Sequence, residues 1–124
     1  MFIGLTDLEN KHIICNGDQV ECVFVDKIDR KGNTATVVQL QSGTFFCVQE
    51  NVLEVAARLN SPMFLNLLDY EYKEIVFNID QIKTVLIGRT RATKGQTIVL
   101  CKSGRSYLIG ERLVDVYRAL CPIT

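Results

Sequence analysis

Residues 1–9 read MFIGLTDLE and residues 63–71 read MFLNLLDYE, so the chain contains two similar openings. A shift of 62 places makes eleven of the first 23 positions identical, and after a one-residue slip in the central loop the matches continue at a shift of 61. A run of matches interrupted once in a loop is typical of a tandem repeat. The sequence therefore predicts two copies of one unit, a first repeat over residues 1–62 and a second over residues 63–124.

Each copy predicts the same elements, which gives two independent interpretations of every segment. Short apolar segments separated by polar turns indicate strands, and Ser-Gly at the last turn suits a hairpin. An apolar stripe at i, i+3, i+4 and i+7 then predicts one helix, starting at Val52 in the first copy and at Leu113 in the second. The strands are expected at 2–6, 12–15, 20–25, 35–40 and 44–48, and at 64–68, 74–77, 82–87, 97–101 and 105–109.

These elements predict an α+β fold that is predominantly β, built from two fused repeats of several antiparallel strands plus one C-terminal helix. A unit of about 60 residues buries only about 60% of its surface, so it is marginal alone. We therefore expect one compact domain in which the repeats share a core and are related by a pseudo-twofold axis.

Polar residues that recur in both copies are expected to be structural. Asn and Asp at turns bond to nearby backbone groups, and a Glu at a helix start complements the helix dipole. This interpretation applies to Asp7, Asn16, Asp18 and Glu50, and to their counterparts Asp69, Asn78, Asp80 and Glu111.

The cysteines and the single histidine give no sign of catalysis or of metal binding. Five cysteines at irregular spacings argue against a disulfide framework, and no pair has the spacing of a zinc site. His12 has no partner in a catalytic pattern, and neither a phosphate-binding loop nor a nucleophile elbow is present. We expect a non-enzymatic protein without a cofactor or a metal site. The apolar segments are too short to span a bilayer, and the N-terminus does not resemble a signal peptide, so we expect a cytoplasmic protein that does not bind a membrane.

The order of motifs resembles that of the flagellar FlbD family. The shared pattern is MF-x-L-x-D-x-E-x-K-x-I-x-x-N-x-D-Q, followed by T-x-V-x-L-x-S-G and a strand–helix tail with Glu50 or Glu111. The chain is also similar, more distantly, to the second half of LytTR DNA-binding domains. FlbD proteins commonly have a proline after the asparagine, whereas this chain has Gly17 and Ile79 there. The FlbD resemblance implies a small regulatory domain of bacterial or phage origin, and the LytTR resemblance implies DNA reading by loops at one end of the sheet.

The two copies differ most clearly in charge. The first copy carries three more acidic than basic side chains, and the second carries three more basic than acidic ones, so the formal net charge is zero. The central loop and the last hairpin of the second copy are therefore candidates for binding an anionic partner, because Arg offers bidentate geometry and a tyrosine can stack on a base. The candidate residues are Arg89, Arg91, Lys94, Lys102, Arg105 and Tyr107.

The sequence thus favours a non-enzymatic regulatory or binding protein that acts on a protein or nucleic-acid partner through exposed sheet edges and this basic region. The alternative is a small-ligand binder that sequesters an anionic nucleotide, for instance between subunits. Exposed strand edges and oppositely charged halves also predict a homo-oligomer.

Overall fold

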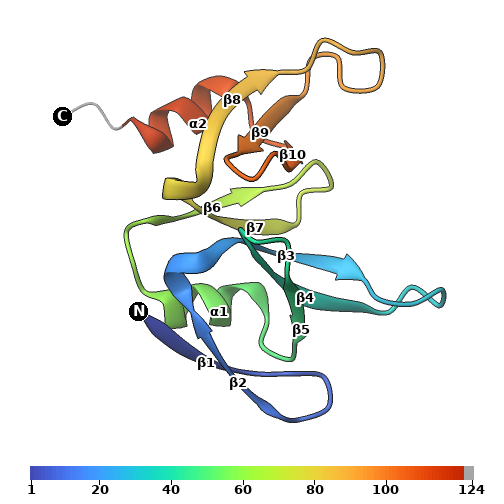
Figure 1. The fold of residues 1–124 in the computed structure, drawn as a ribbon. Helices are drawn as coiled ribbons and strands as arrows, with labels where there is room; N and C mark the ends of the chain where they lie inside the picture. Colours follow the sequence, from blue (N-terminus) through green and yellow to red (C-terminus); the bar gives the residue numbers. More distant parts are fainter. Residues whose placement is uncertain (122–124) are drawn as a thin grey trace.

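The computed structural model describes residues 1–121, and its second half repeats the order of elements found in its first half (Figure 1). Strands dominate both halves, so the expected α+β fold with a predominance of β structure is confirmed. The elements of the first half are β1 (Phe2–Thr6), β2 (His12–Asn16), η1 (Gly17–Gln19), β3 (Val20–Lys27), β4 (Thr34–Leu40), β5 (Phe45–Val48) and α1 (Val52–Leu59). Those of the second half are β6 (Phe64–Leu68), β7 (Glu74–Asn78), η2 (Ile79–Gln81), β8 (Ile82–Ile87), β9 (Thr97–Cys101), β10 (Ser106–Ile109) and α2 (Leu113–Leu120).

The strands form three antiparallel sheets, and the central one contains strands of both halves. Its order is β5-β4-β3-β7-β6, while β1-β2 and β10-β9-β8 form the other two sheets. The halves are joined where β3 pairs with β7, with Cys22 opposite Phe77 and Val23 opposite Val76.

The pairing between the halves corrects the expectation of a pseudo-twofold axis. A twofold axis that relates the halves would require β8, the counterpart of β3, to pair with β2, the counterpart of β7. Within residues 1–121, β8 instead pairs with β9 alone and β2 pairs with β1 alone. The halves are therefore joined head to tail, and Figure 1 shows the β1–β2 hairpin at one end of the molecule and β8 with α2 at the other.

Each half has its own apolar core, and each core includes a side chain from the other half. Val76 of the second half is fully buried in the first core, together with Val23, Val55 and Leu59. Cys22 of the first half is fully buried in the second core. The side chains of β3 and β7 thus cross the joint in both directions.

Asp7 and Asn16 and their counterparts Asp69 and Asn78 have the structural role expected of them. The Asp7 carboxylate accepts hydrogen bonds from the backbone N–H groups of Glu9 and Lys11 at 2.9 and 2.8 Å, and Asp69 repeats this arrangement in the second half. Asn16 and Asn78 each accept a bond from the backbone N–H two residues later.

Glu50 has a different contact from the one expected. Its carboxylate accepts bonds from the Thr6 backbone N–H at 2.9 Å and from Arg58 at 2.8 Å, so it ties α1 to β1. The start of α1 is capped by Asn51 and Glu54, which form a reciprocal capping box. No helix in the described part of the chain is long and apolar enough to cross a bilayer.

The buried position of Val76 gives a matched test of the joint, because its counterpart Ile14 is 78% exposed. Val76→Ala removes apolar contacts from a closed core and should lower the free energy of unfolding by about 2 kcal/mol. Ile14→Ala should change it by less than about 0.5 kcal/mol in dilute solution. Urea denaturation followed by circular dichroism measures both, and equal effects would contradict the assigned joint.

We also expect that residues 1–62 do not fold alone, because this fragment lacks Val76 and strand β7, which cover β3 and α1. The fragment should show no cooperative thermal transition by far-UV circular dichroism. A cooperative transition close to that of residues 1–124 would show that the first half does not depend on the second.

Candidate nucleic-acid interface

The loop between β8 and β9, residues 88–96, carries three exposed cations. They are Arg89, Arg91 and Lys94, and the loop contains no acidic residue. Within residues 1–121 none of the three takes part in an ion pair. Their charges are therefore available to a partner.

Hydrogen bonds within the loop fix its backbone. The Gly88 N–H donates to the Gln96 carbonyl at 2.8 Å, and the Gly95 N–H donates back to the Gly88 carbonyl at 3.1 Å. A Cβ on Gly88 would lie 2.2 Å from the Thr93 carbonyl oxygen, so only glycine fits there. The hydroxyls of Thr90 and Thr93 are 2.6 Å apart and close the turn between them. The loop thus presents its cations from an ordered turn.

The loop between β3 and β4 projects on the same side of the molecule (Figure 1). It also exposes cations, Arg30 and Lys31, but Asp29 lies beside them. The Asp29 carboxylate accepts bonds from the Asn33 side chain at 2.7 Å and from the Lys31 backbone N–H at 2.9 Å. The Asn33 side chain is the main reason that the pKa of Asp29 is lowered, so Asp29 stays ionised and offsets part of the positive charge.

The structure separates the six candidate residues into two groups. Loop 88–96 precedes β9, whereas Lys102, Arg105 and Tyr107 follow it at the β9–β10 hairpin. A strand of five residues spans about 17 Å, so Lys102 and Arg105 lie at the opposite end of β9 from the loop, while Tyr107 pairs with Val99 in the middle of the strand. The six candidates therefore do not lie together on one basic surface.

Arg105 and Tyr107, two of the candidates for binding an anionic partner, are held by a buried carboxylate. Arg105 donates to Glu21 from Nε at 2.8 Å and from Nη2 at 3.1 Å, and only a third of its side chain is exposed. Its Nη2 also donates to the backbone carbonyls of Leu40 and Gln41. The Tyr107 hydroxyl donates to Glu21 at 2.6 Å. Of the three hairpin residues, Lys102 alone is exposed.

The protonation of this cluster follows from its contacts. Burial opposes ionisation of Glu21, but the bonds from Arg105, Ser103 and Tyr107 outweigh it, and the pKa of Glu21 lies below its ordinary value. Burial, reinforced by Cys22 and by the Glu21 carboxylate, raises the pKa of Tyr107. The phenol therefore stays protonated and can donate its hydrogen bond to Glu21. Glu21 is therefore an ionised carboxylate on β3 that binds the second half of the chain.

Sequence reasoning missed Glu21, although a signal was present. It is the one charged residue in the apolar segment at 20–25, and its counterpart in the second copy is Lys83. A charged residue inside an apolar strand whose charge is reversed in the other copy indicates that the residue has its own oppositely charged partner.

The thiols add no metal site in the described residues. No group of three or more His, Cys, Asp or Glu side chains is arranged to hold a metal ion within residues 1–121. Burial raises the pKa of Cys101 to about 12 and also raises those of Cys15 and Cys22, so these thiols are protonated at neutral pH.

Glu21→Gln should destabilise the protein in a pH-dependent manner. Removing one partner of a buried ion pair costs about 3 kcal/mol at neutral pH, toward the low end of the usual range because Arg105 keeps some exposure. A lowered pKa stabilises the fold above the ordinary glutamate value of 4.5 and stops doing so as the pH falls through the folded-state pKa. Urea titrations at successive pH values should therefore show the gap between wild type and Glu21→Gln closing in acid. Glu9→Gln, an exposed control, should show almost no gap, and a pH-independent gap for Glu21→Gln would contradict the assignment.

Comparison with known proteins shows a likeness of fold. The chain is similar to a solved structure described as the LytTr DNA-binding domain of a putative methyl-accepting/DNA response regulator from Bacillus cereus, with a TM-score of 0.65 and 13% sequence identity. The alignment covers 98% of this chain and 97% of that one. No family model and no curated protein matches the sequence. The chain therefore shares the fold of a LytTr DNA-binding domain over nearly its whole length.

Proposed function

We propose that this chain is a non-enzymatic regulatory module that binds nucleic acid through loop 88–96. The observation that carries the proposal is the ordered, acid-free loop with Arg89, Arg91 and Lys94 exposed, on a fold similar to that of a DNA-binding domain.

The chemistry of these side chains suits a phosphate backbone. Arg presents planar pairs of N–H donors that match phosphate oxygens, and each cation that neutralises a phosphate releases counterions. Because the formal net charge of the chain is zero, its overall field does not attract nucleic acid. Binding therefore depends on cations gathered at one place.

Loop 27–33 supports this contact from the same side of the molecule but contributes less. Arg30 and Lys31 are exposed, while the ionised Asp29 reduces their effect on an anion. Lys102 lies at the opposite end of β9 and takes no part in the proposed contact.

We further propose that the chain arose by duplication of one FlbD-like unit in a bacterium or a phage. The recurring order of elements supports the duplication, as do the matching Asx turns at Asn16 and Asn78.

The double substitution Arg89→Ala/Arg91→Ala should weaken binding to a labelled DNA duplex without changing the fold. Removal of each charge-assisted hydrogen bond corresponds to about 1.5–3 kcal/mol, or roughly tenfold or more in Kd. A plot of the logarithm of the binding constant against the logarithm of the salt concentration has a negative slope. This slope should become shallower by about 2, one unit for each phosphate that the variant no longer neutralises. Fluorescence anisotropy over a salt series measures both quantities.

The matched control is Arg30→Ala/Lys31→Ala, which removes the same number of charges from the other loop and should have a much smaller effect. A wild-type protein that binds no duplex at low salt would contradict the proposal. If it instead binds cyclic nucleotides in a parallel titration, the small-ligand alternative replaces the proposal.

A further inference from the structure

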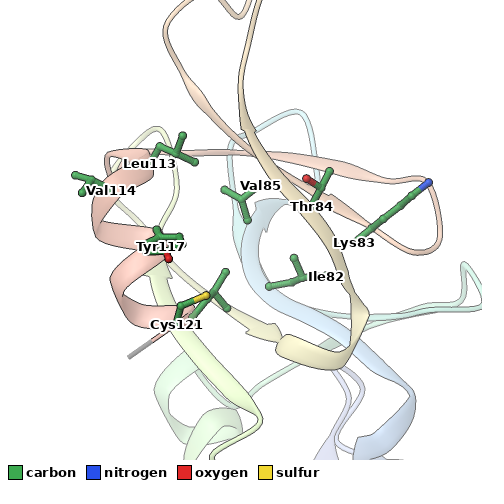
Figure 2. Close-up of a pocket in the computed structure, with 9 residues that line it drawn as sticks. Ile82, Lys83, Thr84, Val85, Leu113, Val114, Tyr117 and Cys121 are labelled. Atoms are coloured by element: carbon green, nitrogen blue, oxygen red, sulfur yellow. The ribbon is translucent and has the colours of Figure 1, made fainter. Parts of the chain in front are cut away.

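An apolar groove runs between strand β8 and helix α2, with a volume of about 510 Å³ (Figure 2). Ile82 and Val85 point from the strand toward the helix, and Tyr117 faces them from α2. The groove is open to solvent: Tyr117 is 57% exposed, and neighbouring Val114 is 43% exposed. Strand β8 borders it with an edge that, within residues 1–121, has no strand partner.

The corresponding groove of the first half, between β3 and α1, is occupied. The β6–β7 hairpin covers it, with β7 paired to β3, Val76 in the core and Phe64 packed against that core. As a result all four residues at 20–23 are fully buried, whereas each of their counterparts at 82–85 keeps some exposure. The two grooves have the same construction, but the β3–α1 groove is covered by a hairpin and the β8–α2 groove is not.

The hairpin that would fit the open groove exists in the chain, at the other end of the molecule. In the β1–β2 hairpin, Ile14 is the counterpart of Val76 and Phe2 is the counterpart of Phe64. Ile14 is 78% exposed and Phe2 is 71% exposed, the two highest values among exposed large apolar residues other than Tyr72. Inside the chain, the β6–β7 hairpin covers the β3–α1 groove. The second hairpin of this kind, β1–β2, and the second groove, β8–α2, are both left uncovered, one at each end of the molecule.

We propose that the β8–α2 groove binds the β1–β2 hairpin of a second copy of this chain, and so repeats between molecules the joint found within one. The internal register, Cys22 with Phe77 and Val23 with Val76, transfers to Thr84 with Cys15 and Val85 with Ile14. Ile14 then enters the groove where Val76 enters the first one, and Phe2 takes the place of Phe64.

A polar contact of the internal joint also has its counterpart. The buried side-chain amide of Asn78 donates to the Val20 carbonyl at 2.9 Å across the joint. Asn16 occupies the same position in β2 and forms the same turn with its side-chain oxygen. Its amide is placed to donate to the Ile82 carbonyl of the second copy.

The charges of the two ends favour the same contact. The hairpin belongs to the half with three excess acidic residues, and the groove belongs to the half with three excess basic residues. One feature makes the joint between molecules weaker than the internal one: Lys83 stands where Glu21 stands, and Thr44 where Arg105 stands, so the buried ion pair is missing. We therefore expect reversible association that depends on concentration.

The two surfaces lie at opposite ends of the molecule, so a pair of copies cannot satisfy both at once (Figure 1). Such a head-to-tail contact produces open chains of copies rather than a closed dimer, unless the rotation between copies closes a ring. The average mass should accordingly rise with protein concentration beyond that of a dimer.

The test uses two variants, each blocked at one surface. Ile14→Asp places a charge on the hairpin, and Tyr117→Asp places one in the groove; both positions are exposed, so each variant should fold and remain monomeric. Ile14→Asp keeps an intact groove, and Tyr117→Asp keeps an intact hairpin. An equimolar mixture of the two variants should therefore form a dimer and nothing larger. Analytical ultracentrifugation of wild type, of each variant and of the mixture measures these masses.

Leu53→Asp is the matched control, because Leu53 is the counterpart of Val114 beside the occupied groove and is 50% exposed. It should assemble as wild type does. If circular dichroism shows that a variant is unfolded, Phe2→Asp and Val114→Asp replace the two blocked variants. Wild type that stays monomeric at high concentration, or blocked variants that still assemble alone, would overturn the proposal.

Discussion

The pairing of β3 with β7 is the contact on which the rest of the structure depends. It makes one five-stranded sheet from strands of both halves, and it carries Val76 into the first core and Cys22 into the second. At the start of β3, the buried carboxylate of Glu21 binds Arg105 and Tyr107 of the second half. Apolar burial, strand pairing and an ion pair therefore act at the same joint.

Because this joint is used once, the repeat leaves two unequal ends. Exposed strand edges favour association with other chains, and proteins usually protect them with charges or bulges. Strand β8 has a register shift between Ile82 and Thr84, but β3 has the same shift at Val20 and Cys22 and still pairs with β7. The irregularity in β8 therefore gives no protection against pairing.

Local patterns were sufficient to predict the strands, the two helices and the Asx turns, since these depend on residues close in sequence. They were insufficient for the arrangement of the halves. Ile14 and Val76 occupy equivalent positions in strands of similar composition, yet one is 78% exposed and the other fully buried. The difference in exposure depends on whether another strand pairs alongside, and the alternation of apolar and polar residues within a strand does not specify which strand that is. Arg105 was misjudged for the same reason: a cation beside a turn suggests a solvated side chain unless the distant carboxylate that binds it is known.

The differences between the copies separate the cations by role. Arg105 is committed to the fold, because its guanidinium satisfies Glu21 and the carbonyls of Leu40 and Gln41. Its counterpart Thr44 has no equivalent carboxylate to bind, because the counterpart of Glu21 is Lys83, which lies on an open strand edge. The cations of loop 88–96 instead have no acidic neighbour within their loop and lie on a backbone that is closed by its own hydrogen bonds. A substitution in that loop can therefore test the proposed binding without disturbing the joint, whereas a substitution at Arg105 acts first on the stability of the fold.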